Sequence, residues 1–341
     1  DKTGEMPGPE IVGEPAVRWR FTAPNGEWMA PAVKAGLVFA SRYNGGLAAF
    51  DALTGSPLWF VPADEFDRFD SSPAVSDNLV VTGAGPYTLL AVEASTGAER
   101  WRYQAEADLS SIPAAARDYA ETIYGMFFSS PTIAGDNVYI SAWSPSGDGT
   151  IGENPANGFY AIDLATGQVR WHVPVAHGAI SSPAVVDGVV YVIDRLATVY
   201  ALDAVTGQQH WSVPVAGIAT SSPAVAAGMV VVSIRGEPNT SDGSVIAFRA
   251  ENGMVAWRHV VAQPSSPAVS RGVAYVASQD GSLTALNLAD GSKRWTFQAA
   301  GALAAPTVVP GAAVYVGSDD GSIHAVELAW GKERWRFTGQ H

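Results

Sequence analysis

Apolar and polar positions along this chain form short segments that recur about every forty residues. Each unit begins at a proline followed by small apolar residues. It continues through two apolar segments split by a tight turn and ends in a segment that carries a tryptophan. Short apolar segments bounded by Gly, Pro, Asn and Asp are typical of β-strands joined by turns. The pattern therefore predicts four strands in each unit.

The turn before the last strand of each unit has a fixed signature: an alanine, a polar or acidic residue two positions later, a glycine four beyond that, and a tryptophan after four more. An Asp side chain there can accept backbone N–H bonds, and Gly supplies the positive φ that reverses the chain. We expect each tryptophan ring to fill the space between neighbouring sheets. The seven tryptophans are Trp59, Trp101, Trp171, Trp211, Trp257, Trp295 and Trp335.

Seven such units predict an all-β fold, a seven-bladed β-propeller of four-stranded antiparallel blades. An eighth related tryptophan, Trp19, precedes the first unit in a context similar to that of Trp335. Its strand would either complete the seventh blade, which removes an exposed sheet edge, or belong to an incomplete eighth blade, which is the alternative fold. We favour seven blades.

Composition agrees with a folded β protein and bounds the domains. The 341 residues are 47% hydrophobic and 16% charged, with 35 Gly and 22 Pro, as many short strands and tight turns require. We expect residues 1–15 to be an extended leader or linker and residues 16–341 to form one propeller domain. A capping insertion is expected at about 102–128, where good helix formers predict a short helix.

Charge and cysteine content remove several functions. The formal net charge of −13 argues against nucleic-acid binding, which needs clustered Lys and Arg to neutralise phosphates. The absence of Cys excludes disulfides, thiolate metal sites and cysteine nucleophiles. No apolar run is long enough to cross a bilayer, so we expect membrane association only through a tether that this chain does not contain.

The long excursions between expected strands, at 61–70, 102–128, 144–158 and 235–243, all fall on one face of the blades. Function in such folds usually lies in loops of this kind. The first two excursions carry aromatic and basic side chains that are candidates for a partner-binding face, or else simply pack the loops onto the blades. These candidates are Phe66, Arg68, Phe69, Tyr119, Tyr124, Phe127 and Phe128.

One loop is a candidate metal site. Asp148, Glu153 and Asn154 lie in an oxygen-rich segment that suits Ca²⁺, although their spacing does not match an EF-hand. The sequence holds no Gly-x-Ser-x-Gly elbow, phosphate-binding Gly-rich loop or His-Glu-x-x-His motif. We therefore predict no catalytic residue.

The recurring Ser-Ser-Pro-Ala-Val, Val-Tyr-Val and Ala-Leu-Asp-Ala-x-Thr-Gly motifs, each followed by Trp, resemble the quinoprotein-type propeller repeat family from about Trp19 to Trp335. That family includes pyrroloquinoline-quinone-dependent dehydrogenases, an outer-membrane assembly lipoprotein and many non-catalytic extracytoplasmic propellers. The resemblance implies a periplasmic or cell-surface scaffold that binds a protein partner. Its alternatives are a quinone-dependent dehydrogenase or small-molecule binder using an axial pocket, and the sensor portion of a membrane receptor.

No cofactor is expected, because no residue here aligns with the Ca²⁺ ligands or the catalytic Asp of those dehydrogenases. Pyrroloquinoline quinone with Ca²⁺ belongs to the dehydrogenase alternative, and Ca²⁺ by itself to the candidate loop of Asp148, Glu153 and Asn154.

Overall fold

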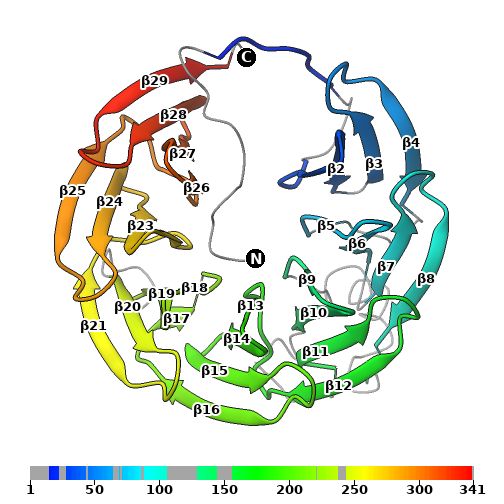
Figure 1. The fold of residues 1–341 in the computed structure, drawn as a ribbon, viewed down its shortest axis with the longest axis horizontal. Coiled ribbons are helices and arrows are strands. Elements are labelled where there is room, and N and C mark those ends of the chain that lie inside the picture. The colour runs from blue at the N-terminus through cyan, green and yellow to red at the C-terminus, as the bar shows by residue number, and fades with distance from the viewer. Residues whose placement is uncertain are drawn as a thin grey trace, which may run out of the picture. The chain divides into compact units, whose positions relative to one another are not determined.

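The structure is a computed structural model that describes residues 15–22, 28–43, 45–63, 69, 71–85, 88–105, 129–143, 156–219, 221–236 and 243–339. Strands in these ranges form seven antiparallel sheets, six of four strands and one of five, and no helix occurs within them. The sheets are the blades of a seven-bladed β-propeller, as the repeat predicts (Figure 1). Contacts along the chain divide it into two compact units, which are described in turn.

The unit built on residues 17–183 holds three blades, coloured blue to green in Figure 1. Blade 1 consists of β1 (Ala32–Lys34), β2 (Leu37–Arg42), β3 (Gly46–Asp51) and β4 (Pro57–Pro62). Blade 2 consists of β5 (Ala74–Val75), β6 (Leu79–Gly83), β7 (Thr88–Glu93) and β8 (Glu99–Gln104). Blade 3 consists of β9 (Thr132–Ala134), β10 (Asn137–Ala142), β11 (Gly158–Asp163) and β12 (Val169–Pro174).

The other unit, built mainly on residues 184–204 and 208–341, holds four blades. Blade 4 consists of β13 (Ala184–Val186), β14 (Val189–Ile193), β15 (Thr198–Asp203) and β16 (Gln209–Pro214). Blade 5 consists of β17 (Ile218–Ala219), β18 (Ala224–Ala226), β19 (Met229–Arg235), β20 (Gly243–Arg249) and β21 (Val255–Val260), where β17 and β18 both pair with β19. Blade 6 consists of β22 (Ala268–Ser270), β23 (Val273–Ala277), β24 (Ser282–Asn287) and β25 (Lys293–Gln298). Blade 7 consists of β26 (Thr307–Val309), β27 (Ala313–Gly317), β28 (Ser322–Glu327) and β29 (Glu333–Thr338).

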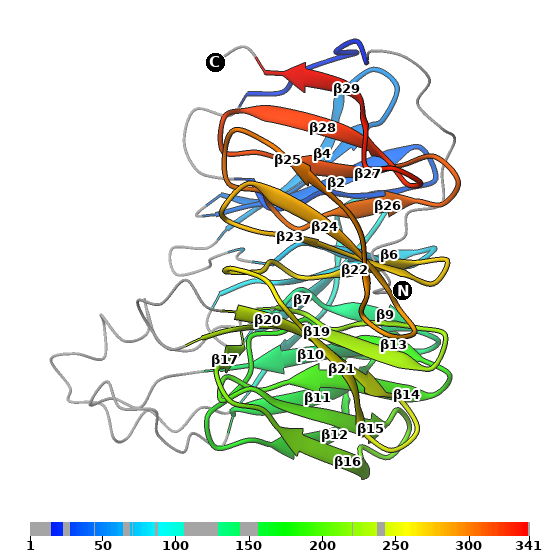
Figure 2. The same cartoon turned by 90° about the vertical axis from the view of Figure 1, so that its left-hand side faces the viewer.

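Burial follows the place of a strand in its blade. In β24, Ala285 packs in a core shared with blade 7, whereas the next residue, Leu286, packs in a core shared with blade 5. A strand covered on both faces needs a continuous apolar run, as its sequence has. In the outermost strand β25 only Trp295 is buried, because the other face meets solvent. Figure 2 shows blades 6 and 7, in orange and red, layered in this way.

The repeat tryptophans join one blade to the next. Trp257 in blade 5 donates its indole N–H to the carbonyl oxygen of Leu288 in blade 6 at 2.7 Å. Its ring lies against Gly291, whose φ is +71°, and a Cβ at that position would be 2.6 Å from the ring. The same bond, at 2.8–3.0 Å, joins Trp59 to Ala94, Trp101 to Leu164, Trp211 to Ala250 and Trp295 to Leu328.

Trp19 makes the equivalent contact to blade 1 although residues 15–22 form no strand. Its indole N–H donates to the carbonyl oxygen of Ala52 at 3.0 Å, and a Cβ at Gly55 would lie 2.5 Å from its ring. The ring also stacks on Phe50, with centroids 6.3 Å apart. The strand predicted around Trp19 is therefore absent, and only the side chain of Trp19 makes the repeat contact with the turn of the first blade.

The serines of the Ser-Ser-Pro motif satisfy backbone groups. Ser129 accepts the N–H of Ser141 on the second strand of its own blade at 2.8 Å. The next serine bonds between blades, since the backbone N–H of Ser130 donates to the hydroxyl of Ser182 at 3.0 Å. The motif thus anchors the short first strand, which has few ladder hydrogen bonds of its own.

Candidate functional site

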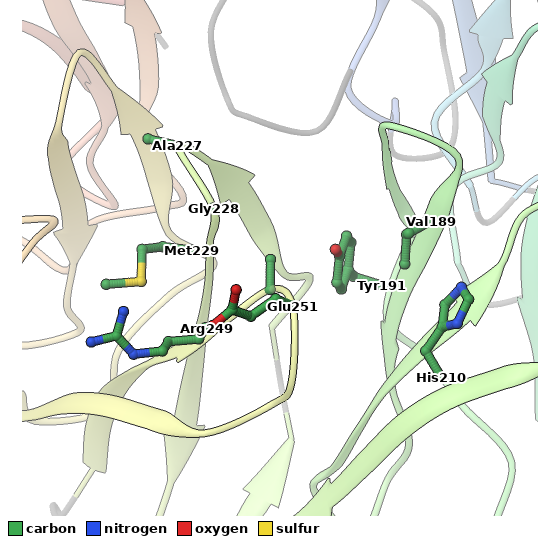
Figure 3. Close-up of a pocket in the computed structure, with 9 residues that line it drawn as sticks. Val189, Tyr191, His210, Ala227, Gly228, Met229, Arg249 and Glu251 are labelled. Carbon is green, nitrogen blue, oxygen red and sulfur yellow. The ribbon is translucent and has the colours of Figure 1, made fainter.

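A groove of about 620 Å³ lies between blades 4 and 5, at the end where the turns between the first and second and between the third and fourth strands are found (Figure 3). Blade 4 contributes Val189 and Tyr191 from β14 and His210 from β16. Blade 5 contributes its two turns, residues 227–229 and 249–251. We call this the blade 4–5 groove.

Local sequence fixes both walls of the blade 4–5 groove. Ala227 and Gly228 have φ of 48° and 73°, the two positive values that a tight turn between antiparallel strands favours. Trp211 of blade 4 donates to the carbonyl oxygen of Ala250 at 2.9 Å and packs on Gly253. The turn that carries residues 249–251 is therefore fastened to the opposite wall, so the groove is preformed rather than made on binding.

Tyr191 and His210 supply polar groups from blade 4. Burial raises the pKa of Tyr191, and the nearby charge of Asp187 adds to the effect. The phenol therefore stays neutral and able to donate a hydrogen bond at physiological pH. The imidazole Nε2 of His210 lies 4.0 Å from a carboxylate oxygen of Asp203, and the side chain is exposed.

Arg249 departs from the repeat. The corresponding position in the other six blades has an acceptor side chain: Asp51, Glu93, Asp163, Asp203, Asn287 and Glu327. In blade 3 this carboxylate accepts the backbone N–H of Thr166 at 2.8 Å and pairs with Arg170. Arg249 cannot accept, but its backbone N–H still donates to the carbonyl oxygen of Met254 at 2.8 Å and its carbonyl still accepts from the N–H of Gly253 at 2.9 Å. The blade 5 turn thus forms without the repeat carboxylate.

The guanidinium of Arg249 has no counter-ion in the described part of the chain, where no carboxylate lies within 4.0 Å of it. Figure 3 shows it on the Met229 side of the groove, pointing away from Glu251. The side chain is exposed on a protein whose net charge is −13. An uncompensated cation of this kind attracts an anionic group.

Another groove, between blades 2 and 3, differs in charge. It measures about 400 Å³ and is lined by two turns of blade 2, one of them carrying Glu93, and by Ala165 of blade 3. Arg100 lines the same groove and binds Glu93 at 2.7 Å, so the charge is neutralised. Hydrogen bonds from Arg100 and then Thr96 lower the pKa of Glu93. The counterparts of Glu93 and Arg100 in the blade 4–5 groove are Asp203 and His210 of blade 4, whose carboxylate oxygen and Nε2 lie 4.0 Å apart.

The lining of the blade 4–5 groove suits binding rather than covalent chemistry. Its residues include no Ser, Thr or Cys that could serve as a nucleophile beside His210. They offer one guanidinium, one carboxylate, one phenol and one imidazole next to the apolar side chains of Val189 and Met229. A few polar groups set in an apolar groove are typical of a recognition site.

A second polar cluster, which the sequence analysis did not find, lies inside blade 7. The hydroxyl of Ser322 is 2.9 Å from Nε2 of His324, and Nδ1 of that ring is 2.6 Å from Glu333. The order of groups matches a serine hydrolase triad, but Ser322 is only 3% exposed and Phe297 contacts the imidazole. The cluster satisfies buried polar groups and is closed to a substrate. The sequence did contain a signal for this cluster, because Ser322 and His324 are two residues apart on a strand and therefore lie on the same face of the sheet.

Most predicted site residues lie outside the described residues. Phe69 is described, and it is fully buried in a core with Phe39 and Leu90. It is therefore a core residue and is unavailable to a partner. The remaining partner-face candidates, Phe66, Arg68, Tyr119, Tyr124, Phe127 and Phe128, and the metal candidates Asp148, Glu153 and Asn154, lie outside the described residues, as does the expected helix at about 102–128.

The described residues bring together no group of three His, Asp or Glu side chains able to hold a metal ion. They also contain no helix that is long and apolar enough to span a bilayer.

Sequence comparison places the repeat among known propellers. A family model described as outer membrane protein assembly factor BamB matches residues 45–158, 155–302 and 279–340. The serine/threonine-protein kinase AfsK of Streptomyces griseus is 30% identical over 151 residues, which are 43% of this chain and 16% of the kinase. The outer membrane protein assembly factor BamB of Xanthomonas campestris pv. campestris is 28% identical over 129 residues, 33% of this chain and 32% of that protein. The matches thus span a third or less of these curated relatives.

Solved structures share the fold at low identity. BamB from Moraxella catarrhalis superposes with a TM-score of 0.69 at 20% identity, covering 91% of this chain and 85% of that one. A europium-containing methanol dehydrogenase gives a TM-score of 0.68 at 15% identity, covering 91% and 77%. One fold therefore serves both an assembly factor and an enzyme, and the likeness alone does not choose between them.

Proposed function

The chain belongs to the family of outer membrane protein assembly factor BamB, and from this premise we propose that it is a non-catalytic, extracytoplasmic propeller that binds a protein partner. The observation that carries the proposal is the family match from residue 45 to residue 340, which includes all the described blades except the first strands of blade 1. The blade 4–5 groove supports it, because its lining offers recognition groups without a nucleophile.

Site-specific photo-cross-linking tests the proposal. A photoreactive phenylalanine placed at Met254, which is 62% exposed next to the groove, should give one defined adduct in the cell envelope. The matched control is Leu53, 65% exposed at the corresponding turn of blade 1, where we expect no adduct of that mass. The captured protein, once purified, should bind this chain in solution by calorimetry. Failure to bind, together with measured turnover of a substrate, would argue for an enzyme.

A quinone-dependent dehydrogenase is the second candidate, because a methanol dehydrogenase shares the fold. The described residues bring together no three His, Asp or Glu side chains, and the candidate Ca²⁺ ligands Asp148, Glu153 and Asn154 lie outside them. Adding pyrroloquinoline quinone with Ca²⁺ and recording the absorbance spectrum and Tm tests this candidate. A saturable spectral change with a raised Tm would favour it over the scaffold.

A sensor portion of a larger receptor is the third candidate. It is favoured by the similarity to part of a protein named as a serine/threonine-protein kinase. The complete gene distinguishes it, because a kinase domain encoded in the same reading frame would make this chain one part of a signalling protein.

A further inference from the structure

We infer that the blade 4–5 groove recognises a carboxylate on an extended segment of a partner protein, with Arg249 as the anchoring residue. The inference rests on the proposed function, since it names the chemistry by which the partner is bound.

The turn of blade 5 does not depend on the side chain of Arg249. In blades 1 and 3 the carboxylate at this position accepts a backbone N–H of the turn, as Asp51 does from Thr54 and Asp163 from Thr166. In blade 5 the turn closes through the backbone N–H and carbonyl of Arg249 and through the Trp211 bond to Ala250. Because the fold neither needs an arginine here nor neutralises it, binding is the remaining role for the charge.

A carboxylate is the group that best matches the available donors. The planar guanidinium of Arg249 can bind both oxygens of a carboxylate, and such charge-assisted bonds are about twice as strong as neutral ones. The neutral phenol of Tyr191 lines the same groove and is also able to donate. Glu251 extends into the groove between these two residues (Figure 3). Its negative charge repels a bound anion in proportion to the charge of that anion, so a carboxylate with one charge fits better than a phosphate with two.

Apolar surface beside the cation argues for a protein segment rather than a free organic acid. Val189 and Met229 line the groove, and Met254 and Val255 just beyond it are 62% and 55% exposed. Together they offer contacts for apolar side chains on either side of the bound carboxylate. The occupant we assign is therefore an extended stretch of a partner in which Asp or Glu is flanked by aliphatic residues.

The blade 2–3 groove serves as an internal comparison. Its lining includes the cation Arg100, which is already bound to Glu93 at 2.7 Å. Because that bond neutralises Arg100, we expect no carboxylate to bind at that groove. Arg100→Gln is accordingly the matched control for a change at Arg249.

Methionine-methyl NMR measures binding at the groove directly. The chain has five Met, of which Met229 lines the groove, Met254 flanks it and Met29 lies in the other unit. The probes are the capped peptides acetyl-Leu-Glu-Leu-Leu-amide and acetyl-Leu-Gln-Leu-Leu-amide. We expect the Glu peptide to shift the signals of Met229 and Met254 but not that of Met29. Its affinity should exceed that of the Gln peptide at least tenfold, as a charged hydrogen bond implies.

Variants assign the preference to the guanidinium. Arg249→Gln should remove the tenfold preference, Arg249→Lys should retain part of it, and Arg100→Gln should leave it unchanged. The urea midpoint of each variant confirms that the protein remains folded. Equal affinity for the two peptides, or a preference that survives Arg249→Gln, would refute carboxylate recognition while leaving partner binding intact. No shift of Met229 at millimolar peptide would refute the groove as the site.

Discussion

The tryptophan contacts between blades allow a quantitative test of what stabilises the packing of one blade on the next. Trp257 is 7% exposed and packs in a core formed by blades 5 and 6. Trp257→Ala removes the indole from that core and leaves a cavity against Gly291. It also deprives the carbonyl oxygen of Leu288 of its donor at 2.7 Å. We expect the two losses to add, because neither has a substitute in the surrounding apolar residues.

The magnitude follows from the two losses. Replacing a buried Trp by Ala costs about 3–5 kcal/mol in lost transfer energy and residual cavity. Leaving the carbonyl of Leu288 unpaired in a buried site adds about 1 kcal/mol. Trp257→Phe helps to separate the two, since it loses the N–H donor but keeps an aromatic ring in most of the space of the indole. We expect about 1–2 kcal/mol for the Phe variant, from the lost bond and a smaller ring.

Urea unfolding followed by far-UV circular dichroism measures these differences, provided that the slope with denaturant is the same in each variant. Trp330→Ala is the control, because that indole is 74% exposed at a turn of blade 7. It should change the unfolding free energy by no more than about 0.5 kcal/mol. The reasoning fails if Trp257→Ala costs less than 1 kcal/mol, or if the exposed Trp330 proves equally costly.

Two further changes test the repeat turn. Gly291→Ala should destabilise by more than the roughly 1–2 kcal/mol of a left-handed residue alone, because its Cβ would lie 2.6 Å from the Trp257 ring; urea midpoints give the value. Hydrogen bonds from Thr166 and then Arg170 lower the pKa of Asp163 from 3.8 to about 2. Its stabilisation is therefore complete above the unfolded value and lost as the pH falls through about 2. Wild type should thus exceed Asp163→Asn in unfolding free energy at pH 7 and converge with it near pH 2, whereas a constant difference would contradict the assignment.

The strands and blades could be predicted from sequence because each unit contains its own local signals for strands and turns. The fixed spacing from Gly291 to Trp295, repeated in every unit, places the glycine at a turn and the indole four residues on, in the outer strand. The contact itself runs to the next blade, where Trp295 meets Leu328. A periodic sequence makes such non-local contacts predictable, since every unit meets a copy of the same surface.

Positions outside the period were harder to predict. Phe69 stands in a charged loop, and nothing local distinguishes it from an exposed aromatic residue. Its burial depends on Leu90 and Val80 in the neighbouring blade 2, a contact that no spacing rule encodes. Residues around Trp19 have the composition of a strand, but they make only the side-chain part of the repeat contact. Local sequence could not predict the burial of Phe69 or the absence of a strand around Trp19, because tertiary packing determines both.

The blade 4–5 groove could have been found from sequence by comparing units with one another. Seven copies in one chain can be aligned with one another. A residue shared by the copies is one that the fold requires, and a copy that departs from it shows that the requirement does not hold there. Arg249 replaces an acceptor found in six units, and the turn of blade 5 keeps its backbone hydrogen bonds without that acceptor. Arg249→Asp would restore the repeat and its bonds to the turn, so we expect a gain of about 0.5–1.5 kcal/mol in stability. The same change should abolish the preference for the Glu peptide, because it replaces the guanidinium by a carboxylate that repels the peptide. A gain in stability with a loss of binding is expected where a binding site is maintained at the expense of stability. Loss of stability in Arg249→Asp would show instead that the arginine belongs to the fold.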